Sequence, residues 1–255
     1  MSKWPHKKKS STSYSTFYPM SKRKRVGVFY VFHEVNERVH HFISNAIFLD
    51  EQVDFIIISN GEAIDVPPYV KTIVRPNVGY DFGGWSEALF TDGNHQRYDY
   101  YLFVNSSVMG PFLADKTKWI DVYIDGLTDR VKLFGSTINT CQDPMNRAHV
   151  QSYLFVMDRA TLHELINCEL FSMKKITTTL AETVEQKEIR MSRWILERGW
   201  NIGSRLPLYH GVDFTFATTA PSDYPIPFLD DVMYYHYRNI LWTNEQLVFI
   251  KGNRV

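Results

Sequence analysis

An apolar run, a helical stripe and a second apolar run follow one another near the start of the chain, and this order limits the fold most. Val26–Phe32 is β-branched and aromatic rather than alternating, as in a strand buried on both faces. Residues 36–49 then place apolar side chains on one helix face, and Phe55–Ile58 is a second apolar run. The stripe consists of Val39, Phe42, Ile43, Ala46 and Ile47. This order predicts a β-α-β unit.

Later apolar runs continue the pattern and predict an α/β fold with a mainly parallel central sheet and helices on both faces. The further strands are expected at Tyr69–Val74, Tyr100–Val104, Val131–Phe134 and Tyr153–Met157, with a helix at Trp85–Phe90. Sheets of this kind bind ligands beyond the carboxyl ends of their strands. The loops that begin at Asn60, Arg75 and Asn105 are therefore where a site is expected.

Charge divides the chain into a basic leader and a mildly acidic body. The formal net charge is zero, although the first 25 residues contain no acid. We predict a disordered basic tail at 1–24 and a single domain at 25–255, in which 210–255 is a C-terminal extension packed on the rest. An acidic body argues against a nucleic-acid partner. The sequence has no apolar run of membrane-spanning length and no signal-peptide pattern, so a cytoplasmic protein is expected.

The segment Arg75–Trp85, RPNVGYDFGGW, is the strongest candidate for a ligand-binding loop. Glycine lets the backbone approach a ligand, the planar fork of Arg suits a diphosphate, and Asp or Asn suits sugar hydroxyls. Together these residue types favour a nucleotide sugar, and a Gly-rich connection with a packed Trp is the structural alternative. The candidate donor-binding residues are Arg75, Asn77, Gly79, Tyr80, Asp81, Gly83, Gly84 and Trp85.

NVGYDFGGW, followed by YYLFVNSSVMGPF and QSYLFVM, resembles the rhamnan synthesis F type glycosyltransferases, relatives of the GT-A class. The likeness extends from Val26 to Trp200. It implies a GT-A-like, Rossmann-type fold. It also implies an enzyme that takes rhamnose or another hexose from a nucleoside-diphosphate sugar and builds a polysaccharide or glycan.

The segment Asn105-Ser106-Ser107 ends the fourth predicted strand, where a GT-A enzyme usually carries Asp-x-Asp. Those carboxylates hold the divalent cation that bridges the donor diphosphate. Three outcomes are open here, in this order: metal-free neutralisation by Arg75 or another base, a weak Mn²⁺ or Mg²⁺ site, or an inactive enzyme. All three residues are candidate donor contacts, and Asn105, Ser107 and His236 are the candidate metal ligands. The structural alternative is a turn closed by Ser and Asn side chains.

A helix is predicted at Leu180–Arg198, ending at Gly199. Its inward stripe contains Leu180, Val184, Met191 and Ile195, and Glu188 falls in the same stripe. A carboxylate on an inward face is costly unless it is paired or lies in a site. Glu188 is therefore the candidate base that deprotonates the acceptor hydroxyl, with Glu185 in reserve. The alternative is a structural ion pair between Glu188 and Arg75 or another base. The family also tends to place Ser four residues after this Glu, as Ser192 does here.

Three polar residues are candidates for contact with the acceptor or a phosphate, namely His149, Ser152 and His236. A histidine among aromatic residues is more often a hydrogen-bonded core residue, which is the alternative for both histidines. Asp230 and Asp231 are expected in a solvated loop.

These features predict a glycosyltransferase with a nucleoside-diphosphate sugar donor and a glycan acceptor. The alternative is a catalytically inactive nucleotide-sugar or glycan-binding protein derived from such an enzyme, suggested by the missing Asp-x-Asp.

Overall fold

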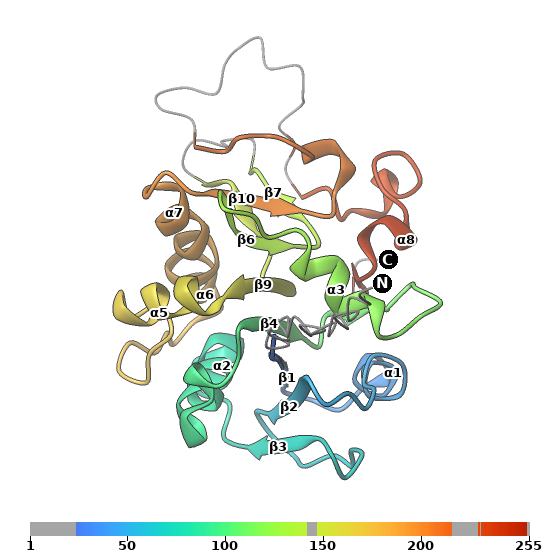
Figure 1. Ribbon diagram of the computed structural model, residues 1–255, viewed down its shortest axis with the longest axis vertical. Helices are drawn as coiled ribbons and strands as arrows, with labels where there is room; N and C mark the ends of the chain where they lie inside the picture. Colours follow the sequence, from blue (N-terminus) through green and yellow to red (C-terminus); the bar gives the residue numbers. More distant parts are fainter. Residues whose placement is uncertain (1–23, 142–146, 216–228, 230, 254–255) are drawn as a thin grey trace, which may run out of the picture.

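A seven-stranded sheet crosses the molecule in the order β10-β6-β9-β4-β1-β2-β3 (Figure 1). The computed structural model describes residues 24–141, 147–215, 229 and 231–253, so the predicted tail lies outside the described residues except for Lys24. The strands are β1 (Val26–Phe32), β2 (Val53–Ser59), β3 (Lys71–Val74), β4 (Tyr100–Asn105), β6 (Val131–Gly135), β9 (Leu154–Asp158) and β10 (Asn201–Ser204). Strands β1 to β4 are parallel, β10 is parallel to β6, and β9 is antiparallel to both neighbours. The predicted mainly parallel α/β sheet is confirmed.

Helices cover both faces of the sheet. Alternate side chains of each strand point to opposite sides, so both faces carry apolar side chains that pack against helices. On one face Phe29 and Val31 pack with α2 (Tyr80–Phe90), α5 (Arg159–Asn167) and α7 (Arg190–Leu196). On the other face Tyr30 and its neighbours pack with α1 (Glu37–Asn45) and α3 (Lys118–Ile124). Figure 1 shows these two groups of helices on opposite sides of the strands.

Two helices differ from their predicted bounds. Helix α2 begins at Tyr80, five residues before the predicted Trp85, so the YDFGG segment is its first turn and not a loop. The helix expected at Leu180–Arg198 consists of α6 (Leu180–Thr183), the π-helical turn η2 (Val184–Ile189) and α7. The π-helical turn changes the helical period. Leu180, which was predicted to face inward, is 64% exposed, whereas Lys187, which lies outside the predicted stripe, is only 6% exposed.

Short elements close the fold around this framework. Strand β5 (Val108–Met109) pairs with β11 (Ile250–Lys251), and β7 (Ile138–Asn139) pairs with β8 (His149–Val150). The remaining elements are η1 (Thr91–Gln96), η3 (Pro207–Tyr209), η4 (Tyr235–Tyr237) and α8 (Asn244–Leu247). Within the described ranges, no helix has the length and apolar character needed to cross a membrane.

Candidate functional site

The predicted loops meet at the edge of the sheet where β1 to β4 end, here called the carboxyl edge. Asn60, Arg75 and Asn105 lie at the ends of β2, β3 and β4. Because β9 is antiparallel to β4, the residues that precede it, including Ser152, lie at the same edge. Four separate segments therefore place polar groups at the position where α/β sheets bind ligands.

Arg75 is buried and binds the protein itself. Its Nε donates to Glu87 Oε2 at 2.7 Å, Nη1 to Asn60 Oδ1 at 2.6 Å and Nη2 to the Val78 carbonyl at 2.9 Å. A guanidinium already surrounded by acceptors is poorly placed to receive a diphosphate. Arg75 fixes the loop after β3, so the predicted direct donor contact is not supported, and its ion pair is with Glu87 rather than Glu188.

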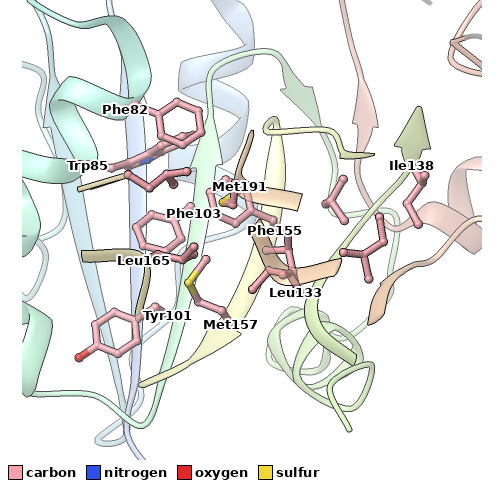
Figure 2. Packing of buried hydrophobic residues seen from close by; sticks show 14 of the residues in the cluster. Phe82, Trp85, Tyr101, Phe103, Leu133, Ile138, Phe155, Met157, Leu165 and Met191 are labelled. Carbon is pink, nitrogen blue, oxygen red and sulfur yellow. The ribbon is translucent and has the colours of Figure 1, made fainter. Parts of the chain in front are cut away.

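Trp85 and two of the glycines in the predicted loop are packing residues. A Cβ on Gly83 would lie 2.1 Å from the Val78 carbonyl oxygen, and one on Gly84 would lie 2.8 Å from Val31 Cγ2. The Trp85 ring is fully buried between Phe82, Phe103 and Phe155 (Figure 2), and its Nε1 donates to the Phe29 carbonyl at 3.1 Å. The structural alternative holds for Trp85, which does not close a ligand loop.

The start of α2 remains open to a ligand. Gly79 precedes the helix with a φ of 78°, in the left-handed region that favours glycine, and no side chain caps this end in the described part of the chain. A cavity of about 300 Å³ lies beside it, lined by Asn77, Val78, Gly79, Tyr80, Ile176, Thr177 and Thr178. Unpaired N–H groups and the helix dipole at such an end favour an anion.

Asp81 in the first turn of α2 meets the segment at the end of β4. Asn105 Nδ2 donates to Asp81 Oδ2 at 2.9 Å, while Asn105 Oδ1 accepts from Ser107 N–H at 2.9 Å. The predicted turn closed by an Asn side chain is therefore present. The pKa of Asp81 is raised to about 6. Burial is the largest cause, the hydrogen bond from Asn105 opposes it, and the charge of the nearby Glu188 adds to it.

Glu188 lies in the π-helical turn, partly buried, and faces the same region. Its Oε1 accepts from Ser152 N–H at 2.6 Å, and Ser192 Oγ accepts from Val150 N–H at 3.0 Å. The Glu188 and Ser192 pair therefore holds the segment before β9 by two backbone hydrogen bonds. Single π-helical turns often occur at functional sites. The structure brings Asp81, Asn105, Ser152 and Glu188 together, as expected of a site built from several segments.

The other candidates lie apart from this group. Glu185 is exposed and pairs with Arg147 at 2.9 Å. His149 is buried, and its Nδ1 lies 2.6 Å from the Arg147 carbonyl, as in the core alternative. His236 is exposed in η4 and contacts the rings of Tyr234 and Tyr237. No hydrogen bond joins His236 to Asn105 or Ser107 in the described residues, and none of these residues forms a cluster of three or more metal-ligating His, Cys, Asp or Glu side chains. A metal-binding role for Asn105, Ser107 and His236 stays a prediction.

Two further polar residues were not predicted in their observed roles. Arg38 Nε donates to the Ser106 carbonyl at 2.9 Å, which places a cation beside the Asn105–Ser107 turn. An Arg at the second position of the first helix carries no sequence signal of that contact. Asp231, expected in solvent, is buried and accepts from Gln151 Nε2 at 3.3 Å, whereas Asp230 lies outside the described residues.

Fold and site together define an α/β protein with a mainly parallel sheet and two carboxylates from different helical segments at its carboxyl edge. The family model described as rhamnan synthesis protein F matches residues 42–239, and the chain belongs to this family. No curated protein matches the chain.

A solved structure titled as CMP:2-keto-3-deoxy-manno-octonic acid synthetase complexed with CTP is similar to this chain, with 11% identity and a TM-score of 0.38. The match covers 69% of this chain and 86% of the synthetase.

Proposed function

We propose that this chain is a glycosyltransferase that moves a hexose, such as rhamnose, from a nucleoside-diphosphate sugar to a hydroxyl group of a glycan. Its membership in the rhamnan synthesis protein F family supports a role in polysaccharide synthesis. The observation that carries the proposal is the convergence of Asp81, Asn105 and Glu188 at the carboxyl edge. Nucleotides bind at this edge in sheets of the same architecture.

Glu188 is the proposed base. The Ser152 N–H fixes one carboxylate oxygen, and the other, Oε2, has no hydrogen-bond partner within the described ranges. A general base needs such an oriented and accessible lone pair. In the transfer, the acceptor oxygen forms a bond to the anomeric carbon, the bond from that carbon to the diphosphate oxygen breaks, and Glu188 Oε2 takes the acceptor proton.

The donor diphosphate is proposed to lie between the start of α2 and the Ser106–Ser107 turn, in reach of the cavity beside Asn77, Gly79 and Tyr80. Two adjacent carboxylates would repel a diphosphate, and Arg75 is already bonded within the protein. These contacts favour a divalent cation over metal-free neutralisation through Arg75. Asp81 is the residue that would hold Mg²⁺ or Mn²⁺, since such ions bind through one or two carboxylates plus substrate phosphates. The cation would neutralise charge on the departing diphosphate.

The variant Glu188→Gln tests the proposal. The purified chain is incubated with a panel of nucleotide sugars and candidate glycans, while donor binding is measured by calorimetry and release of nucleoside diphosphate is followed. Loss of the base should lower turnover by about 10²–10⁴-fold and leave donor affinity unchanged. Glu185→Gln is the matched control, because Glu185 is exposed and paired with Arg147. Its turnover should stay near that of the wild type.

Two results would contradict the proposal. A wild-type chain that binds no nucleotide sugar is not a transferase of this kind, and equal turnover in wild type and Glu188→Gln removes Glu188 as the base. A second candidate function is a binding protein without turnover, favoured by Asn105 at the position of the usual Asp-x-Asp. It predicts donor binding without diphosphate release for every acceptor.

A further inference from the structure

A second cavity, of about 440 Å³, lies between the end of α5 and the π-helical turn. This volume is within the range of small-molecule sites. Its lining combines apolar and cationic side chains, with Glu169 as its one carboxylate. The residues that matter here are Leu170, Ile176, Trp194, Lys175, Lys187 and Arg190. The transfer proposed above uses none of the three cations, and of these six residues Ile176 also lines the cavity beside the start of α2.

Lys187 is a buried cation without a neutralising partner. It is 6% exposed, and its Nζ donates to the Leu170 carbonyl at 2.7 Å and the Glu169 carbonyl at 3.3 Å. Carbonyl dipoles satisfy two of the three ammonium donors but do not cancel the charge. No carboxylate in the described part of the chain forms an ion pair with Lys187. Such a charge is costly to bury, and burial lowers the pKa of Lys187 accordingly.

Two more cations line the same cavity and keep donors free. Lys175 pairs with Glu169 at 2.5 Å, and Arg190 uses Nη1 for both oxygens of Glu197. The remaining nitrogens of Arg190 have no hydrogen-bond partner in the ranges that the structure describes. Three cations therefore surround one cavity. Glu169 and Glu197 offset two of these charges, so an anion would supply the counter-charge that Lys187 lacks.

We propose that this cavity, whose lining includes neither Asp81 nor Glu188, is a binding site for a small phosphate-bearing ligand held by Lys187 with Arg190 and Lys175. A phosphate supplies the negative charge that Lys187 lacks, together with several acceptor oxygens for the free donors of the three cations. Apolar contact with Leu170 and Ile176 provides room for a carbon-containing part of the ligand.

Titration of the full chain with inorganic phosphate, followed by calorimetry and by thermal unfolding, tests the site. The wild type should bind phosphate saturably and melt at a higher temperature in its presence. Arg190→Gln and Lys187→Met should each weaken binding by about tenfold or more, since each removes a charged hydrogen bond. Arg190 is about half exposed, so its variant keeps the test valid if Lys187→Met does not fold.

Two controls separate this site from other phosphate binding. Lys118→Gln removes an exposed lysine on α3 and should leave phosphate affinity unchanged. The loss caused by Arg190→Gln should be the same in an Asp81→Asn background, which alters only the carboxyl edge, so failure here and failure of the proposed transferase are distinguishable. The proposal is overturned if the wild type shows no saturable binding, or if Arg190→Gln binds phosphate as tightly as the wild type.

Discussion

Asp81 is a carboxylate whose charge is poorly solvated in the folded chain, and this gives a pH signature. Its pKa is raised from 3.8 to about 6, mainly by burial. The folded chain therefore holds this proton to a higher pH than the unfolded chain does. The contribution of Asp81 makes the free energy of unfolding fall as pH rises from about 4 to about 6, by at most about 3 kcal/mol.

The variant Asp81→Asn should lack this fall, and denaturant unfolding in EDTA from pH 4 to pH 7 measures it. Asn105 can still donate to the amide oxygen, so the local contact is kept. Adding Mn²⁺ should stabilise the wild type above pH 6, and Asp81→Asn much less, since the cation binds the ionised carboxylate. Identical pH profiles of the two proteins would show that folding does not raise the pKa of Asp81.

Residue type alone indicated which residues meet at the carboxyl edge but not the direction of each side chain. The sequence predictions named Asp81, Asn105, Ser152 and Glu188, and these residues do meet at the carboxyl edge. Arg75, the predicted diphosphate ligand, instead forms an ion pair with Glu87. Helix α2 begins at Tyr80, and its residue Glu87 lies beside the loop after β3. A contact of this kind depends on the path of the chain, which composition does not give.

At the scale of elements, Gly83 decides how α2 joins the loop after β3. A Cβ at this position would lie 2.1 Å from the Val78 carbonyl oxygen, a backbone atom that cannot rotate away. We expect Gly83→Ala to cost about 3 kcal/mol or more in free energy of unfolding. Gly93→Ala is the control, because that position has a positive φ but no atom within 4 Å, and it should cost about 1 kcal/mol. Equal losses for the two variants would contradict the role of Gly83.

Elements with a regular period were predicted well, and irregular ones were not. Strand β1 has its predicted bounds, because a continuous apolar run identifies a buried strand without further context. The π-helical turn was missed, since a helical period assigned to 180–198 conceals one inserted residue. Within this turn Lys187 contacts the residues after α5, and Glu188 contacts Ser152.

At the scale of the molecule, the sheet class followed from the order of strands and helices, but the closing contacts did not. The strands β5 and β11 have two residues each, too few to show a period, and they pair across most of the chain length. This pairing holds the turn after β4, where Gly252 N–H donates to the Ser107 carbonyl at 2.7 Å. The C-terminal segment thus supports the candidate site from the side of α1 and α3.

Phe249 is the side chain that anchors this segment. It is fully buried, and its ring lies 5.0 Å from Trp119 and 6.2 Å from Phe42, which belong to α3 and α1. Phe249→Ala should cost about 3–5 kcal/mol in free energy of unfolding, because it leaves a cavity between the two helices. Turnover should also fall, since the turn at Asn105–Ser107 loses its support. Ile240→Ala, at a position 76% exposed, should change the free energy of unfolding by less than about 0.5 kcal/mol. If urea unfolding gives both variants the same stability, the C-terminal segment does not brace the site.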